Sequence, residues 1–308
     1  MSAPSNQEDA PVADRATLRG IRPMTRRQFL QRLALAGACS GVAGGAWAWR
    51  ESRSPVVERF EFALPRLSNA FDGTTVAFLA DTHHGPFVPL EYLAEVVRLT
   101  NALAPDIVAL GGDYVQRRRP VYPQGNQRHL VAPAINVLGG LRAPLGRFAV
   151  LGNHDHKVSA MLTRRALAQA GFLELTNTGV SLRRDDGGKL WFCGVDDFRT
   201  GKPNLPRALR GCGPRDACLL LSHNPDLVER LRDPRVGLVL SGHTHGGQVV
   251  LPGVGAPFTA SRHGQKYRAG LVKGPTTRVY VSRGVGTIGL PLRWGAPPEI
   301  TLLTLRAG

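Results

Sequence analysis

Short apolar runs separated by polar turns recur along the chain from about residue 56 to the C-terminus. Residues 75–80, 107–110 and 148–151 are such runs, and each predicts a short buried strand. Residues 56–64 predict an edge strand. The same pattern predicts further strands at residues 190–194, 218–221, 238–240, 279–282 and 299–305.

Helical periodicity appears between several of these strands. Residues 89–103 carry an apolar stripe with helical spacing, which Pro105 stops. Residues 159–170 are amphipathic and end at Gly171, as expected for a helix closed by a glycine after its last turn. Residues 132–141 and 225–231 are the other predicted helices. The alternation of strands and helices indicates an α/β layered domain.

The first 50 residues differ from the rest. Residues 1–23 are rich in Pro, Ser, Asp and Arg, and we expect them to be disordered. Arg26-Arg27 precedes an uncharged, small-residue stretch at 33–49, the pattern of a twin-arginine export signal. Ala46-Trp47-Ala48 offers the small-x-small pattern that a signal peptidase cuts, and an uncut membrane anchor is the alternative.

This difference divides the chain in two. Residues 1–50 are interpreted as a disordered N-terminus plus a twin-arginine signal or membrane anchor. Residues 51–308 show neither an internal repeat nor a linker, so we expect one folded domain.

Charge narrows the range of partners. The chain has a formal net charge of +16, and only five of its 39 basic residues are lysine. A basic balance favours phosphate-bearing substrates, anionic lipid surfaces or nucleic acid. No run of basic residues interleaved with aromatic ones appears, so nucleic acid is not an expected partner.

The four cysteines form no Cys-x-x-Cys pair, and a thiolate zinc site is therefore not expected. Cys39 lies in the leader. A disulfide between Cys212 and Cys218 is compatible with the sequence, although nothing in the sequence requires one.

Residues that can bind metals follow the predicted strands, and the carboxyl ends of strands in an α/β sheet converge on one rim. Five of the nine histidines lie in these turns. A mixture of carboxylate, imidazole and amide oxygen suits a divalent cation. Two His/Asp clusters linked by one carboxylate suit a pair of metals about 3.5–4 Å apart. The candidates are Asp81, His83, Asp113, Asn153, His154, His223, His243 and His245.

The stretch Gly152-Asn153-His154-Asp155 combines metal binding with proton transfer. The Asn153 carbonyl can ligate without adding charge, His154 can move a proton, and Asp155 can orient the imidazole ring. A polar turn is the alternative interpretation of this stretch taken alone, because Gly, Asn and Asp are common turn formers.

Taken in order, these motifs resemble those of the calcineurin-like metallophosphoesterases. The resemblance runs from about residue 57 to the C-terminus, and it implies a four-layer α/β/β/α sandwich of two mixed sheets flanked by helices. The motifs that carry it are Asp81-x-His83, Gly112-Asp113, Gly152-Asn153-His154-Asp155, Ser222-His223 and Gly242-His243-Thr244-His245.

The leader and the stretches 222–226 and 242–248 look most like the bacterial exported, cell-envelope branch of that family. This branch is similar to enzymes that hydrolyse UDP-2,3-diacylglucosamine in lipid A synthesis. The resemblance thus implies a protein of the periplasm or cell envelope, exported by the twin-arginine translocase or anchored to the inner membrane by an uncut leader.

The resemblance also implies roles for single residues. One metal would be held by Asp81, His83, Asp113 and His245, and the second by Asp113, Asn153, His223 and His243, with Asp113 bridging. His154 would protonate the leaving oxygen, steadied by Asp155, while a hydroxide shared by the two cations attacks phosphorus. Manganese is the most expected metal, with iron or zinc as alternatives, because histidine-rich sites disfavour magnesium.

Two residues near the expected site are candidates for substrate binding. His84 directly follows a ligand turn, where a structural hydrogen bond is the alternative. Arg117 begins a basic loop, residues 117–119, that would recognise an anionic headgroup if it folds over the site; a solvated loop is the alternative. The late loop 290–294 combines apolar residues with Arg293, and could meet a lipid or membrane surface or simply pack.

The function expected from the sequence is a two-metal phosphohydrolase. It would cleave a phosphomonoester, phosphodiester or pyrophosphate in a phosphorylated small molecule or a lipid-linked substrate. The first alternative is a lipid A pathway UDP-2,3-diacylglucosamine pyrophosphatase at the inner membrane. The second is a non-catalytic metal-binding scaffold, which the full set of expected ligands argues against.

Overall fold

The computed structural model describes residues 41–116, 127–185 and 187–308. The chain divides into two compact units, Met1–Gly44 and Gly45–Gly308. The larger unit begins within a helix that continues to residue 51. Within the described residues, no helix combines the length and apolar character needed to cross a membrane.

The first sheet has six strands in the order β1-β12-β2-β3-β4-β5. β12 runs antiparallel to β2, and every other neighbouring pair in this sheet is parallel. β1 lies at the sheet edge, as its sequence predicts. The bounds are β1 Val56–Leu64, β2 Thr75–Leu79, β3 Ile107–Leu110, β4 Gly146–Ala149, β5 Leu173–Glu174 and β12 Glu299–Ala307.

The second sheet also has six strands, in the order β10-β11-β9-β8-β7-β6. Its central strands are parallel, and antiparallel hairpins close both edges. The bounds are β6 Thr178–Arg183, β7 Lys189–Gly194, β8 Ala217–Leu221, β9 Leu238–Ser241, β10 Gly270–Lys273 and β11 Arg278–Val281.

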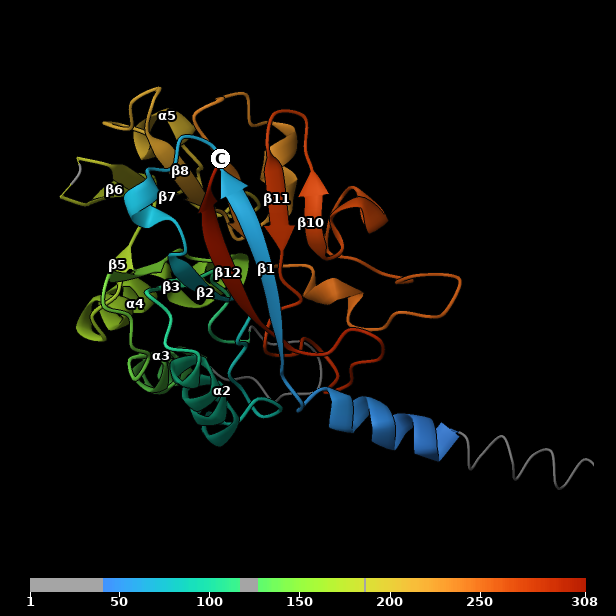
Figure 1. Ribbon diagram of the computed structural model, residues 1–308. Helices are drawn as coiled ribbons and strands as arrows, with labels where there is room; N and C mark the ends of the chain where they lie inside the picture. Colours follow the sequence, from blue (N-terminus) through green and yellow to red (C-terminus); the bar gives the residue numbers. More distant parts are fainter. Residues whose placement is uncertain (1–40, 117–126, 186) are drawn as a thin grey trace, which may run out of the picture. The chain divides into compact units, whose positions relative to one another are not determined.

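Three α-helices cover the outer face of the first sheet, as Figure 1 shows at the lower left. They are α2 Leu90–Ala102, α3 Val131–Leu138 and α4 Asn153–Gln169. Their buried side chains, including Val96, Ile135 and Leu167, pack against Val108 and Leu110 of β3. Burial of this apolar stripe is what stabilises the helices on the sheet.

The two sheets pack face to face through a second core, in which the rings of Phe148 and Phe192 stack at 4.7 Å. The outer face of the second sheet is covered by short helices and loops, with Leu209 and Val228 against Val239. The short helices are α5 Leu205–Ala208, η1 Asn69–Phe71, η2 Gln127–Leu130, η3 Pro225–Glu229, η4 His245–Gly247 and η5 Gly264–Tyr267.

The fold is therefore an α/β sandwich of two mixed six-stranded sheets, as the sequence predicts. One of the two outer layers consists of short helical segments, which lack the long periodic stripe of α2 or α4. β5, β6 and β10 are not predicted by the sequence, because they are short or only partly buried and carry no apolar run.

One helix boundary corrects the sequence prediction. α4 begins at Asn153, not near residue 159, so the Asn153-His154-Asp155 stretch forms a helix N-terminus instead of a turn. Ser159, at φ −179° and ψ 100°, interrupts this helix and separates its polar first part from the predicted amphipathic part. Gly171 follows the helix at φ 79°, as predicted.

The three cysteines among the described residues are buried free thiols. Cys218 lies with its Sγ atom 3.7 Å from that of Cys193, in van der Waals contact. The disulfide between Cys212 and Cys218 that the sequence leaves open is therefore not formed.

Candidate metal centre

The predicted ligands lie on loops at the carboxyl ends of strands from both sheets. Asp81 and His83 follow β2, Asp113 follows β3, and Asn153 opens α4 after β4. From the second sheet, His223 follows β8, and His243 and His245 follow β9.

Backbone hydrogen bonds tie these loops together. The Asp81 N–H donates to Gly112 O, and the His83 N–H donates to Asp113 O. Between the sheets, the His243 N–H donates to Asp81 Oδ2 at 2.8 Å. The ligand positions are thus set by backbone contacts rather than by long side chains alone.

The first group of donor atoms comes from Asp81, His83 and His245. His83 Nε2 lies 3.7 Å from Asp81 Oδ1, and His245 Nε2 lies 3.6 Å from the same oxygen. The two Nε2 atoms are 3.0 Å apart. Three donors from distant parts of the chain therefore point at one small volume, as metal ligands do.

The second group comes from Asp113, His223 and His243. His223 Nε2 lies 3.2 Å from Asp113 Oδ2 and 3.1 Å from His243 Nδ1. The Nδ1 of His223 is 2.8 Å from Gly111 O, a contact that places the proton on Nδ1 and leaves Nε2 as a donor to a metal.

Asp113 joins the two groups. Its Oδ2 is 3.2 Å from His223 Nε2 in one group and 3.7 Å from His83 Nε2 in the other. Its Oδ1 accepts the His154 N–H at 2.7 Å, which fixes the orientation of the carboxylate. This is the position that a bridging carboxylate between two cations must occupy.

The donor atoms fit a pair of divalent cations. Asp81 Oδ1 and Asn153 Oδ1 are buried without a hydrogen-bond partner among the described residues, which is costly for a polar atom. The nitrogens of two histidine pairs also face each other at about 3 Å. Cations bound among these oxygens and nitrogens would satisfy both observations.

Backbone strain gathers at the same residues. Among the described residues, nine that are not glycine have a positive φ, and five of them are predicted ligands. This conformation is uncommon for residues other than glycine, and it persists only where the surroundings enforce it. The five ligands are Asp81, His83, Asp113, His243 and His245.

Burial and charge set the protonation of the carboxylates. Burial raises the pKa of Asp81 to about 7. Burial would also raise the pKa of Asp113, but the surrounding imidazoles of His223, His154 and His83 hold it well below its usual range. Asp113 is thus the negative centre of the cluster.

The pKa values of the histidines are also shifted in opposite directions. Burial lowers the pKa of His83 to about 3 and that of His245 well below its ordinary value, so both rings are neutral donors. Burial opposes protonation of His223 as well, but contact with Asp113 raises its pKa to about 10. A cation bound beside Asp113 would replace that proton.

His154 lies next to both groups. One of its donor atoms is within 4.8 Å of donor atoms of His83 and Asp113. Its ring meets the His83 ring edge-on at a centroid distance of 4.7 Å. At 9% exposure it is the most accessible residue of the cluster, which suits a group that exchanges protons with substrate or solvent.

Asp155 is fully buried under the Asp113 loop. Its Oδ2 accepts the N–H groups of Asp113 and Gly152, and its Oδ1 accepts that of Tyr114. Burial raises the pKa of Asp155 to about 7 against these three bonds. The contacts show that Asp155 braces the loop carrying the bridging carboxylate; that it also steadies His154 stays a prediction.

The two candidates for substrate binding have different outcomes. His84 is buried, and its Nδ1 donates to Val88 O at 2.8 Å, so the structural hydrogen bond proposed as the alternative is present. Arg117 lies outside the described residues, and its role stays a prediction.

Two arginines lie near the centre, and the sequence pattern does not assign either of them to it. Arg199 Nη1 lies 3.3 Å from His243 Nε2, whereas His243 Nδ1 faces His223. Arg293 is completely buried, and its guanidinium donates to carbonyls of His245, Arg283, Gly284, Gly286 and Ala296. The loop 290–294 is therefore anchored at Arg293 by hydrogen bonds to the ligand loops.

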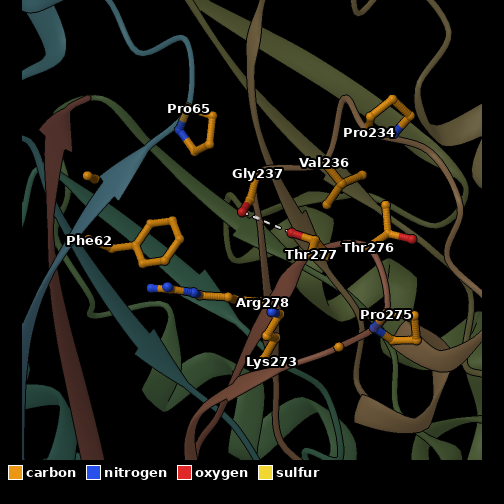
Figure 2. Close-up of a pocket in the computed structure, with 12 residues that line it drawn as sticks. Phe62, Pro65, Pro234, Val236, Gly237, Lys273, Pro275, Thr276, Thr277 and Arg278 are labelled. Carbon is orange, nitrogen blue, oxygen red and sulfur yellow. Dashed lines mark hydrogen bonds between the residues drawn. The ribbon is translucent and has the colours of Figure 1, made fainter.

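A separate cleft of about 530 Å³ lies at the other end of β9 (Figure 2). It runs between Phe62 and the turn from Lys273 to Arg278, and the Thr277 hydroxyl donates to Gly237 O at 3.0 Å across its wall. Gly237 precedes β9, whereas His243 follows it, so this cleft is not part of the metal centre.

The geometry defines a class of protein. Two groups of buried imidazole and carboxylate donors share one aspartate at the rim of a mixed α/β sandwich, which is the centre of a dimetal phosphoesterase. The sequence model of the calcineurin-like phosphoesterase family matches residues 74–247. The chain belongs to this family and is a metal-dependent phosphohydrolase.

Relatives extend the match over nearly the whole chain. The uncharacterized metallophosphoesterase YkuE of Bacillus subtilis is 33% identical over 93% of this chain and 99% of its own length. The phosphodiesterase YaeI of Escherichia coli is 33% identical over 92% of this chain and 99% of its own. Among solved structures, a dimetal phosphatase from Danio rerio is 10% identical over 70% of this chain and 88% of its own, with a TM-score of 0.43.

Proposed function

We propose that this protein is a phosphodiesterase in which His154 gives a proton to the leaving oxygen. The placement of His154 beside Asp113 and His83, at the most accessible point of the cluster, is the observation that carries the proposal. The name of YaeI, a phosphodiesterase that is 33% identical over nearly its full length, supports a diester as substrate.

When bound, the two cations would supply Lewis acidity, lowering the pKa of water and offsetting charge on the phosphoryl oxygens. The residues of the chain position the centre and the substrate. Asp113 holds the two halves of the centre in register, and Asp155 fixes the Asp113 loop through three backbone bonds. Arg199, an exposed cation beside His243, is placed to meet the negative charge of a phosphate.

His154→Ala tests the acid role. An alkoxide needs a proton to leave, whereas p-nitrophenolate does not, so the loss must depend on the leaving group. We expect the rate on an alkyl diester to fall by about 10²–10⁴-fold, and the rate on bis-p-nitrophenyl phosphate to fall much less. Metal content, measured by mass spectrometry, should stay that of the wild type.

The exposed His263, which makes a ring contact with Tyr267, provides the control variant His263→Ala. Its rates on both substrates should match those of the wild type. Equal losses on the two substrates in His154→Ala would refute proton donation by His154.

We further propose that the metals are manganese, with iron or zinc as the alternatives, because the donors mix imidazole with carboxylate and amide oxygen. Rates measured after reconstitution with each metal decide this point. A protein that is active only with magnesium would contradict it.

The leader carries a separate proposal. Arg26-Arg27 before an uncharged stretch supports twin-arginine export to the periplasm or cell envelope. With both arginines changed to lysine, we expect the protein to stay in the cytoplasm in a fractionation experiment. Unchanged export of this variant would overturn the proposal.

A further inference from the structure

Large apolar side chains are exposed on three segments beside the metal centre. Of the fourteen exposed large hydrophobic residues in the described part of the chain, nine lie on these segments. We call the nine residues the apolar platform: Trp47, Trp49, Val249, Leu251, Val254, Phe258, Ile288, Leu290 and Trp294. Val254 and Phe258 are the most exposed of them, at 70% and 76%.

Hydrogen bonds join the two loops of the platform. The Val250 N–H donates to Trp294 O at 2.7 Å, and the Trp294 N–H donates to Gln248 O at 2.9 Å. The Gln248 side-chain amide donates to the carbonyls of Ile288 and Leu290. Figure 1 shows these loops at the lower right of the ribbon, in orange and red.

The segment with the two tryptophans is bonded to the same loops. The Arg293 N–H donates to Ala48 O, and the Ser52 hydroxyl donates to Pro291 O at 2.9 Å. Trp47 and Trp49 end the uncharged stretch that begins at residue 33. Within the described part of the chain, the segment that carries the two tryptophans is thus held against the platform loops.

The chain around the platform is basic. No acidic residue occurs between Asp233 and Glu299 in the sequence, whereas eight Arg and Lys residues do. Among these eight, Arg262, Lys266, Lys273 and Arg278 are exposed, and the last two line the separate cleft at the other end of β9. Lys266 forms an ion pair with Glu229, in which Lys266 Nζ lies 2.5 Å from Glu229 Oε1. Arg50 and Arg262, both exposed, supply positive charge beside the platform. The acidic residue on its segments is Glu51, which accepts hydrogen bonds from Trp47 Nε1 and the Ala296 N–H.

Exposed Trp, Phe and aliphatic side chains in a basic surrounding match the interface of an anionic lipid bilayer. Tryptophan concentrates at the headgroup level, and each basic residue near such a surface adds roughly fivefold in affinity. A protein partner would instead need acidic groups to match this charge.

We propose that the apolar platform seats the protein on the surface of an anionic phospholipid bilayer. The platform is continuous with the metal centre, because His245 is three residues from Gln248 and Arg293 donates to carbonyls of both His245 and Gly286. Docking through this surface holds the metal centre close to the lipid headgroups. The docking surface stands independently of the proposed diester hydrolysis.

A local probe distinguishes this contact from attachment through the leader. Phe258→Trp places a fluorophore on the platform of the full-length protein, and Met161→Trp places one at a matched exposure of 73% on α4. Vesicles of phosphatidylcholine with phosphatidylglycerol carry brominated acyl chains, which quench tryptophans that enter the bilayer. Because Trp47, Trp49 and Trp294 already lie on the platform, quenching is measured as the difference between each variant and the wild type. We expect the tryptophan added at residue 258 to be quenched and the one added at residue 161 to be unaffected.

Two further measurements complete the test. Val254→Ser with Phe258→Ser should weaken binding to the anionic vesicles by about tenfold or more, while Met161→Ser with Leu173→Ser should not. Both double variants should hydrolyse bis-p-nitrophenyl phosphate in solution like the wild type, which shows that they are folded.

Equal quenching at residues 258 and 161 would overturn the proposal. So would self-association of the protein without vesicles that the Val254/Phe258 variant abolishes, because the platform would then join two copies of the chain. A wild type that binds vesicles through the platform but cleaves no diester would leave the docking surface intact and refute the proposed function.

Discussion

Gly152 sits so close to the bridging carboxylate that a single methyl group should disable the metal centre. A Cβ atom at this position would lie 2.2 Å from Asp113 Oδ1 and 2.7 Å from Asp113 Cγ and N. Ordinary van der Waals contact begins near 3.4 Å. In Gly152→Ala, the carboxylate or the start of α4 must therefore move by about 1 Å.

Such a shift is large for this site. Metal–ligand distances tolerate only about 0.2 Å, and a displacement of about 1 Å costs on the order of 100-fold in rate. Asp113 Oδ1 also holds the His154 N–H at 2.7 Å, so the same shift moves His154. The φ of Gly152 is −105°, which any residue adopts, and the effect is therefore steric rather than conformational.

The assay measures bound metal by mass spectrometry and kcat/KM on bis-p-nitrophenyl phosphate. We expect Gly152→Ala to lose at least one of two ions and about 100-fold in kcat/KM, while its circular dichroism stays that of a folded protein. Gly45→Ala is the control, because a Cβ there meets nothing within 4 Å. If Gly152→Ala keeps both ions and a rate within about threefold of the wild type, the tight seat of Asp113 is refuted.

Two other variants test the supports of the site. His156 Nε2 lies 2.7 Å from Asp196 Oδ1, and this contact raises the pKa of His156. Burial alone would raise the pKa of Asp196, but hydrogen bonds from His156 and the Lys202 N–H outweigh it and lower that pKa to about 2. The pair therefore stabilises the fold fully between the unfolded pKa values of 3.8 and 6.5, and loses this effect as pH rises through the folded pKa of His156 or falls toward 2. Asp196→Asn should lower the pKa of His156 in an NMR titration and destabilise the protein more near pH 6 than near pH 9; an unchanged His156 pKa would contradict the pairing. Arg293→Lys leaves at least two buried carbonyls without a donor, at about 1–3 kcal/mol each, and should lower Tm by roughly 10 °C. Arg98→Lys, at an exposed pair with Glu95, should leave Tm unchanged, and equal Tm values for the two variants would show that the Arg293 contacts carry no stability.

The strands and the chemistry of the rim follow from local sequence. Runs such as Ile107–Leu110 are buried on both faces, and an apolar run records that burial directly. Asp81, Asp113 and His243 are predicted as ligands because each follows such a run. The structure brings them together as the parallel strands require.

Other features depend on contacts between distant residues and leave no local signal. The Asn153-His154-Asp155 stretch is polar, yet it forms the first turn of α4, because Asp155 is bonded to the Asp113 loop 42 residues earlier. Nothing in the sequence around Arg293 indicates that it is buried, but its side chain is completely buried among carbonyls. Likewise, the contact between Arg199 and His243 joins residues 44 positions apart, on loops that follow β7 and β9, and β8 lies between these two strands in the sheet.

The backbone strain of the ligands is likewise invisible in the sequence. Histidine and aspartate carry no sign that they will adopt a positive φ, as His83 and Asp113 do. The surrounding glycines hint at it, since Gly112 has a φ of 90° and its missing Cβ makes room for Gly152 N.

The claim that everything else depends on is that two cations share Asp113. Metal analysis of the purified full-length protein, together with anomalous diffraction at the metal edge, tests it most directly. We expect two ions per chain, each within about 2.0–2.3 Å of an Asp113 oxygen, and the loss of at least one of the two ions in Asp113→Ala. A single ion, or two ions that touch Asp81 and His223 but not Asp113, would contradict the account.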